Sequence, residues 1–441
     1  MTTTRAEIID KREKAREQQL ALIAAKVPDA YAWLEAECLA HIDEIIQPEQ
    51  MAEARKRLEW ELKMIQEHRL AVIFLHLREY MEKAGITADE VLHRGSLPCS
   101  VVSYLLGLTN LNPITYGLPT ELFYGRYKNG AFVYKLPAIE FAVSYKVREK
   151  SIDILKHLPG VGEAMEVGWQ HQHWIAFLPQ EHAPEIGPAF RKENGNLCAV
   201  FYQEAREKCW YWFLNADDRL EHLSLLYERT SVRPENIGLD DQGVLTYLRE
   251  NNIYMKEPLC FADLRLETLG LGLGGTNFDS GKDYSDEYQE MVEMLKPASF
   301  TDFAKIEGLF HGEGAWSEKI QSMVKAGELT IKNIFATRED VKEYFEAKGV
   351  PPEKVCNMPF LSRDKEKLVA VSQQADIDEW CRESCQEIKS LFPRAGVLSR
   401  ALVYWRLAYF RHYYPEIFYE TLFLSKQMPS GSYRYGAYEP A

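Results

Sequence analysis

Two hydrophobic patterns alternate along this chain, and their order constrains the fold more than any other feature. Over residues 5–90 the apolar side chains recur near the helical period, as Leu58 and Leu62 do. Residues 120–215 instead hold short alternating runs, such as AFVYKLPAIEFAV and KCWYWFL, that are typical of strands in one sheet. The helical pattern returns after about residue 220. We therefore predict an α+β fold that is mostly helical and carries one small sheet.

The same changes of pattern divide the chain into regions. We predict an N-terminal helical region at 1–90, a strand-containing region at 91–220 and a second helical region at 221–426. The last residues, 427–441, look like a loose tail. With 441 residues and 46% apolar content, the chain can bury a sizeable core without disulfides or metals.

Charge and composition narrow the classes of function. A net charge of −14 argues against a molecule covered with phosphate contacts, so any nucleic-acid binding has to be local. None of the eight cysteines lies in a C-x-x-C pair, which favours reduced thiols over a zinc site. The N-terminus has no apolar core of the signal-peptide type, and no apolar run is long enough to span a membrane. We therefore expect a cytoplasmic protein without membrane contact.

Three short motifs have a chemical interpretation and a plainer one. LPGVG at 158–162 has the form of a helix-hairpin-helix turn that binds DNA phosphate, although a single copy is more often only a turn. GLGLGG at 270–275 lacks the Lys-Ser/Thr of a phosphate loop and is interpreted as an ordinary loop. His171 and His173 stand two apart at the start of a predicted strand, where both could face a metal. Because no third ligand lies nearby, we predict no metal site there.

The segment 392–415 sets four arginines among aromatic residues and contains no acidic side chain. These arginines are Arg394, Arg400, Arg406 and Arg411. Such a basic aromatic face can bind nucleic acid. The alternative is a largely buried helix whose arginine stems lie along apolar surface or pair with carboxylates elsewhere in the chain. Both interpretations stay open at the level of sequence.

Four separated segments resemble the C-family α subunit of bacterial DNA polymerase III, most closely its PolC type. The resemblance covers about residues 55–425. It is clearest in PASFTDFAKIEGLFHGEGAW and in the later FPRAGVLSRALVYWRLAYFRHYYP, which are similar to the family's fingers. His311 there matches the G-L-S-H-G run, and Arg394 stands in the F-P-K-A-H motif. The resemblance implies a small palm sheet of the polymerase-β-like nucleotidyltransferase type, followed by helical fingers.

The resemblance also implies positions that contact nucleotide or nucleic acid. HRGSLPCS is similar to the family's R-G-S-x-G-S-S phosphate motif, with Pro98 in place of its second glycine. WQHQHWIAFLP is similar to the run Q-H-P-G-G-I-I-V-V-P. The positions that the resemblance and the basic segment together assign to nucleotide or nucleic acid are Arg94, Gly95, Ser96, Gln170, His171, His311, Arg394, Arg400 and Arg411.

The catalytic aspartates of the family are replaced. LPAIEFAV is similar to the strand that carries P-D-I-D, and Ala138 and Glu140 take the two aspartate positions. Trp212 takes the third, in a segment similar to L-D-I-L-G. Asp217 and Asp218 follow shortly afterwards but match a later acidic pair of the family. Since alternate strand residues deliver paired carboxylates to two Mg²⁺ ions, the resemblance implies that catalysis is lost.

We therefore predict a non-catalytic, PolC-like pseudo-polymerase that binds a protein partner, in a phage, mobile-element or defence setting. Its thumb is expected to be lacking between residues 150 and 159. A first alternative is a module that binds DNA through the fingers. A second is an active DNA-directed DNA polymerase or nucleotidyltransferase that uses Glu140 with Asp217 or Asp218. We expect no cofactor, except Mg²⁺ if that second alternative holds, and we expect Trp212 to be buried.

Overall fold

The computed structural model of the chain describes residues 5–128, 131–169, 172–179, 189–191, 197–199, 208–251, 284–351 and 377–427. Three features of the sequence lie outside the described residues: the GLGLGG motif, the pair Gln170 and His171, and the predicted tail from residue 428 onward. For His173 only the backbone is described, within a strand.

The described helices are α1 Arg5–Ala24, α2 Ala30–Ile45, α3 Met51–Glu67, α4 Ala71–Ala84, α5 Val101–Leu105, α6 Glu121–Tyr124, α7 Tyr145–Leu155, α9 Asp218–Thr230, α10 Gln242–Glu250, α12 Tyr284–Leu295, α13 Phe300–His311, α14 Glu318–Lys325, α15 Arg338–Ala347, α18 Glu379–Glu387, α19 Arg394–Tyr413 and α20 Pro415–Gln427. The strands are β1 Leu92–His93, β2 Gly125–Lys128, β3 Ala131–Tyr134, β4 Ile139–Val143, β5 Val161–Trp169, β6 Gln172–Pro179, β7 Ala189–Arg191, β8 Leu197–Ala199 and β9 Trp210–Ala216. This arrangement confirms the predicted α+β, mostly helical class.

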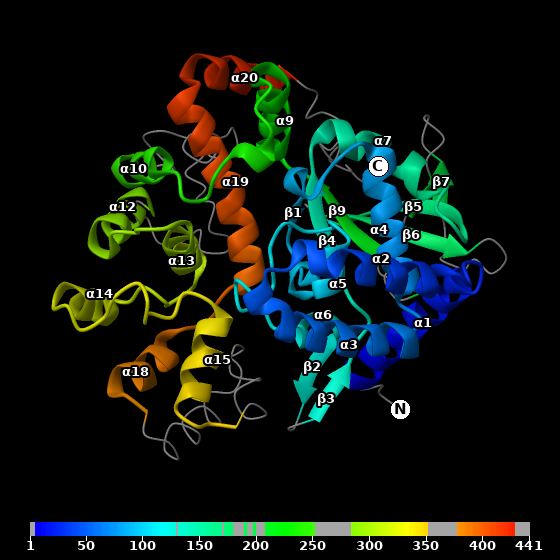
Figure 1. Ribbon diagram of the computed structural model, residues 1–441, viewed down its shortest axis with the longest axis horizontal. Coiled ribbons are helices and arrows are strands. Elements are labelled where there is room, and N and C mark those ends of the chain that lie inside the picture. The colour runs from blue at the N-terminus through cyan, green and yellow to red at the C-terminus, as the bar shows by residue number, and fades with distance from the viewer. Residues whose placement is uncertain are drawn as a thin grey trace, which may run out of the picture.

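One mixed sheet holds seven strands in the order β1-β4-β9-β6-β5-β8-β7, and β2 and β3 form a separate hairpin. Strand β4 runs parallel to β9, whereas β1 pairs antiparallel to β4 and β6 antiparallel to β9. The sheet lies on one side of the molecule and the later helices lie on the other (Figure 1). The residues that resemble the polymerase site therefore sit on β4, on β9 and on the turn that follows β1.

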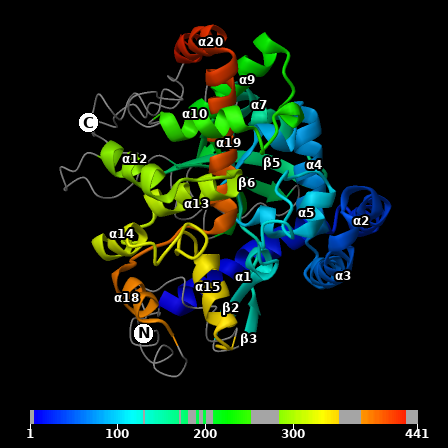
Figure 2. The ribbon, with the colours of Figure 1, turned by 60° about the vertical axis from the view of Figure 1, so that its left-hand side comes forward.

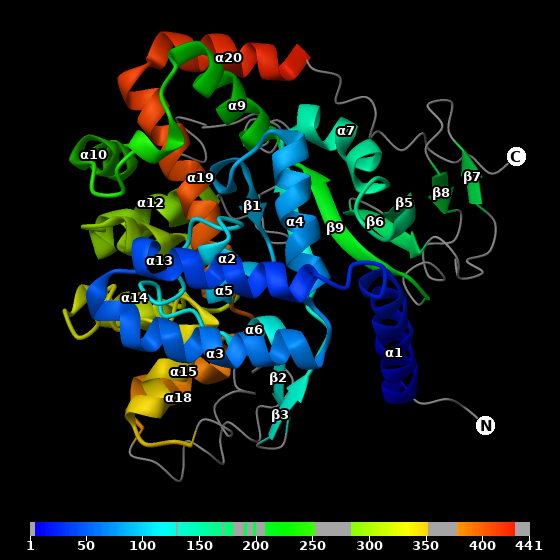
Figure 3. The same ribbon diagram turned by 45° about the vertical axis from the view of Figure 1, so that its right-hand side comes forward.

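Helices of the N-terminal half cover one face of the sheet. Helix α4 contacts α7, and α7 contacts β5 and β9. The ring of His76 on α4 lies 6.2 Å from that of Trp210 and 6.4 Å from that of Phe177. Helix α1 lies near the start of β9, where the Arg16 guanidinium donates to the Tyr211 hydroxyl at 2.8 Å (Figure 3). One face of the sheet is thus covered by α4 and α7, and α1 lies beside the start of β9.

The long helix α19 joins the two halves of the molecule. It contacts α9, α10, α13 and the strand β1, and Figure 2 shows it running down the molecule beside α10 and α13. At the strand, the backbone N–H of His93 donates to the Ser399 hydroxyl at 2.9 Å. One hydrophobic core runs from Leu20 to Leu422 and includes residues of all three predicted regions. The division of the chain into separate domains therefore stays a prediction.

The LPGVG motif connects α7 directly to β5. Gly160 has φ +75°, and a Cβ there would lie 2.6 Å from the Ile23 carbonyl oxygen. Only glycine fits both the backbone angle and this close approach. Because a strand follows the motif, the plainer interpretation as a turn is confirmed. The segment 150–159, where a thumb is expected to be lacking, holds the end of α7 and this turn.

Among the helices that the structure describes, none is both long enough and apolar enough to span a bilayer.

Candidate functional site: the sheet face that carries Glu140

The register between β4 and β9 decides which side chains share a face of the sheet. Ile139 pairs with Trp212, and Glu140 pairs with Phe213. Paired residues of neighbouring strands point to the same side, and alternate residues of a strand point to opposite sides. Glu140 therefore shares its face with Phe213, while Trp212 lies on the other face.

Trp212 is completely buried in an aromatic cluster. Its ring lies 5.1 Å from that of Phe177, 5.8 Å from that of Phe141 and 5.9 Å from that of Tyr80. The expectation that Trp212 is buried is confirmed. The position beside Glu140 is nevertheless taken by Phe213, so the structure corrects the sequence-based placement of Trp212 at the metal-binding face.

Glu140 lies against the turn that follows β1. Its backbone carbonyl accepts the N–H groups of Arg94, at 3.0 Å, and of Gly95, at 3.3 Å. A Cβ on Gly95 would lie 3.3 Å from the Glu140 Cβ and 3.4 Å from the Ala138 oxygen, which explains the small residue there. Burial raises the pKa of Glu140, and Lys135 and Arg94 oppose that shift. Ala138 has no side chain that could ligate a metal, so Glu140 is the carboxylate that this stretch supplies.

Asp217 follows β9 and caps α9, since its side chain accepts the Arg219 backbone N–H at 3.0 Å. The Arg219 guanidinium also grips both carboxylate oxygens, at 2.9 and 2.7 Å, and Arg94 approaches to 3.5 Å. Burial works to raise the pKa of Asp217, but the two guanidinium groups hold it well below its usual range. A carboxylate bound in this way is a structural ion pair rather than an available metal ligand.

No group of three or more His, Cys, Asp or Glu side chains that could hold a metal occurs within the described parts of the chain. A two-metal site needs carboxylates that reach both ions. The residues present around Glu140 therefore do not fit a pair of Mg²⁺ ions.

The turn that resembles the phosphate motif is occupied by the protein itself. Ser100 caps the start of α5, and its hydroxyl donates to Glu61 of α3. Glu61 also accepts the Val101 N–H at 2.7 Å and the Tyr124 hydroxyl at 2.7 Å, and it is completely buried. The hydroxyl of Ser100, the last residue of the motif-like run HRGSLPCS, thus serves an internal carboxylate. Burial raises the pKa of Glu61 to about 7 although these donors lower it.

Three of the predicted contact residues come together between the sheet and the later helices. The His311 ring and the Arg400 guanidinium lie 6.0 and 5.3 Å from the centre of the same Phe392 ring. Arg94 follows His93, whose backbone N–H donates to Ser399 beside Arg400. The Arg94 side chain is 46% exposed. Burial, followed by the nearby Arg400, lowers the pKa of His311. Arg94 and Arg400 are together called the arginine cluster below.

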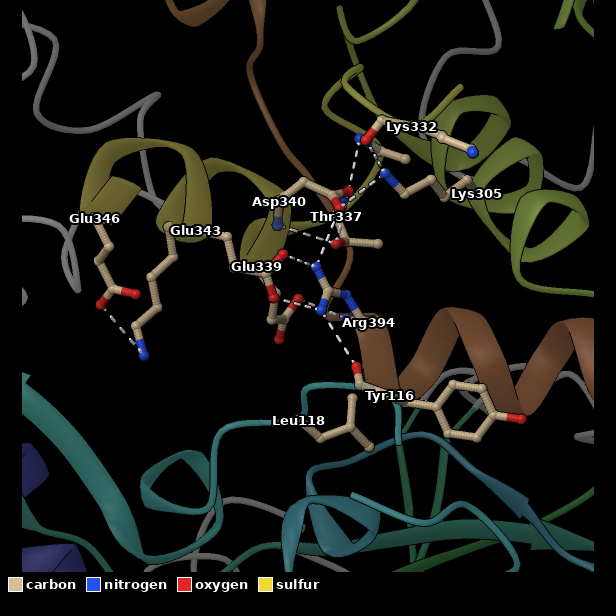
Figure 4. Close-up of polar contacts among 12 residues, drawn as sticks. Tyr116, Leu118, Lys305, Lys332, Thr337, Glu339, Asp340, Glu343, Glu346 and Arg394 are labelled. Atoms are coloured by element: carbon tan, nitrogen blue, oxygen red, sulfur yellow. Dashed lines mark hydrogen bonds and ion pairs between the residues drawn. The ribbon is translucent and has the colours of Figure 1, made fainter. Parts of the chain in front are cut away.

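The basic segment predicted that Arg394 could contact nucleic acid. In the structure its side chain is instead bound by other residues of the chain (Figure 4). Its guanidinium donates to the Tyr116 carbonyl at 3.2 Å, to both Glu343 oxygens at 2.6 and 2.7 Å, and to Asp340 at 3.1 Å. The Arg406 side chain is buried and pairs with Asp89. For these two arginines the structure supports the alternative of a largely buried helix with paired arginines.

Arg411 lies near the far end of α19, with its guanidinium 4.3 Å from the centre of the Tyr419 ring. Ser96 immediately precedes the short turn Leu97–Cys99. Three residues of the site were missed at the level of sequence: Glu61, Phe213 and Arg219. Glu61 resembles an ordinary surface carboxylate of an amphipathic helix, and no local signal marks it as buried.

Comparison with known proteins finds similarity to bacterial DNA polymerases. The family model "Bacterial DNA polymerase III alpha NTPase domain" matches residues 32–171. Over these residues the chain is similar to the bacterial DNA polymerase III α subunits.

The similar curated proteins are of the PolC type. "DNA polymerase III PolC-type" of Clostridium perfringens is 31% identical over 46% of this chain, which corresponds to 14% of that protein. The protein of the same name from Thermotoga maritima is 23% identical over 84% of this chain and 33% of its own length. The chain therefore spans at most about a third of the length of these PolC-type relatives.

Proposed function

We propose that this chain is a PolC-like protein that does not synthesise DNA and acts by binding. One observation supports this most directly: on the sheet face that carries Glu140, Phe213 stands where a second carboxylate is needed. Asp217, the nearest alternative, is held by Arg219 and Arg94. Losing the metal-bridging carboxylates removes the groups that stabilise the attacking and leaving oxygens in phosphoryl transfer.

Binding of Mn²⁺, followed by electron paramagnetic resonance, tests the metal site without requiring activity. We expect the chain to bind Mn²⁺ no more tightly than its Glu140→Ala variant does. Glu228→Gln changes a carboxylate that is exposed and far along α9, and it serves as the matched control. Specific Mn²⁺ binding that disappears only in Glu140→Ala would refute the proposal and support the active alternative.

The partner that we propose first is a protein. The net charge of −14 disfavours nucleic acid over most of the surface. Arg394 and Arg406, which the basic segment offered to DNA, are held by carboxylates of the chain itself. Affinity purification of the intact chain from its host, followed by mass spectrometry, would identify this partner.

A second candidate function, binding of nucleic-acid phosphate, is favoured by the arginine cluster. Among the described residues Arg400 has no carboxylate partner, and Arg94 is half exposed. Fluorescence anisotropy with a labelled single-stranded oligonucleotide tests this candidate. Arg400→Gln should lower the affinity and flatten its salt dependence, because fewer counterions are released. Arg229→Gln, which removes an exposed arginine elsewhere, should change neither quantity. Equal affinities for all three proteins would exclude this candidate.

A further inference from the structure

A cavity of about 550 Å³ lies between α3 and α15, away from the sheet face described above. Helix α3 forms one wall and α15 the opposite wall, while residues 117–121 and Phe132 of β3 complete the lining. Figure 4 shows Glu339 and Glu343 of the α15 wall together with Leu118. A cavity of this volume is within the range of small-molecule and side-chain binding sites.

Two of the cationic side chains that line this cavity, Arg57 and Lys342, are already paired with carboxylates. Arg57 donates to Glu53 at 2.8 Å and to the Leu118 carbonyl at 2.8 Å. Lys342 pairs with Glu121 at 3.2 Å and with Glu346 at 3.8 Å. An incoming anion would have to compete with these carboxylates for the same cations.

Glu339 is the independent feature that points to a ligand. Its side chain is buried, with 2% of the residue exposed, and it lines the cavity. One oxygen accepts the Arg394 backbone N–H at 2.7 Å. The other oxygen, Oε1, is buried without a hydrogen-bond partner among the described residues. A buried carboxylate oxygen of this kind calls for a donor.

Aromatic rings complete the chemistry of the cavity. Trp60 is half-buried and meets Phe132 edge to face, with 5.7 Å between ring centres. Both rings line the cavity. The faces of tryptophan and phenylalanine attract cations, and they do so more strongly where water is excluded.

We propose that this cavity binds an organic cation, a guanidinium or alkylammonium group, with its N–H donors directed to Glu339 and its apolar stem against Trp60 and Phe132. The group can come from an arginine or lysine side chain of another protein or from a free polyamine. The proposal does not depend on whether the chain binds DNA, and its polyamine form does not require a protein partner.

Isothermal titration calorimetry of the full chain with N-acetyl-arginine amide, with spermidine and with inorganic phosphate tests the proposal. We expect at least one of the two cations to bind and phosphate not to bind. Glu339→Gln should weaken the cation at least about five-fold, because the charge-assisted hydrogen bond is lost. Glu328→Gln, an exposed carboxylate outside the cavity, should leave the affinity unchanged.

Lys56→Glu provides a variant that does not touch the buried carboxylate. Lys56 is exposed and lines the cavity, so this change makes the site more negative without disturbing the core. It should tighten cation binding at least about two-fold. Binding of the arginine probe alone would support a protein side chain as the source, and binding of spermidine alone would support a free polyamine. Failure of both cations to bind, an unchanged affinity in Lys56→Glu, or binding of phosphate would overturn the proposal.

Discussion

Trp212 and Phe213 are neighbours on β9 but face opposite sides of the sheet, and replacing each with aspartate tests that assignment. Trp212 is fully buried, so Trp212→Asp would place an unpaired charge in an aromatic core. We expect it to lower the free energy of unfolding by at least about 4 kcal/mol. Phe213 is half-buried, and Phe213→Asp should cost about 2 kcal/mol. Urea denaturation measures both, and a larger cost for Phe213→Asp would contradict the register.

Glu61 gives a pH-dependent prediction at the same scale. Burial raises its pKa in the folded protein from 4.5 to about 7, so the folded state holds the proton more tightly than the unfolded state does. The stability linked to this proton is complete below the unfolded pKa and is lost as the pH rises through about 7. The free energy of unfolding that is lost through Glu61→Gln should therefore shrink by up to about 3 kcal/mol between pH 4.5 and pH 8.

Urea denaturation of both proteins at several pH values checks this dependence. Glu59→Gln, an exposed change on the same helix, should show no comparable trend. If the cost of Glu61→Gln grew with pH instead, the hydrogen-bond donors around Glu61 would outweigh its burial, and the pKa of Glu61 in the folded state would be lowered rather than raised.

At the level of elements, the junction of β9 and α9 depends on Asp217. Its pKa is lowered in the folded state, so the stability it supplies is present above the unfolded pKa of 3.8 and is lost as the pH falls below it. Asp217→Asn keeps an oxygen for the cap but loses the charge opposite Arg219 and Arg94. We expect it to cost about 3 kcal/mol at pH 7 and at pH 5, and less below pH 3.8.

Denaturation of Asp218→Asn is the matched control, because Asp218 is the next residue and lies in the first turn of α9. It should change the free energy of unfolding by less than about 1 kcal/mol. A cost for Asp217→Asn that is as small as that of Asp218→Asn would show that the two arginines do not hold the junction together.

For the whole molecule, hydrophobic pattern was sufficient to predict the class of fold and the burial of Trp212, because both depend on local periodicity. It could not predict the face that Trp212 occupies, which depends on how β9 is aligned with the distant strand β4. It also could not predict the partners of Arg394, since Glu343 and Asp340 come from α15 and Tyr116 from the first half of the chain. Charges that look available in a sequence are paired only once the chain is folded.

Primer extension tests the central claim most directly. The intact chain is incubated with a primed DNA template, deoxynucleotides and either Mg²⁺ or Mn²⁺, and the products are resolved by length. The account predicts no template-dependent extension, because Phe213 and Ala138 leave Glu140 without a second ligating carboxylate. Template-dependent incorporation by the chain, abolished by Glu140→Ala, would contradict it.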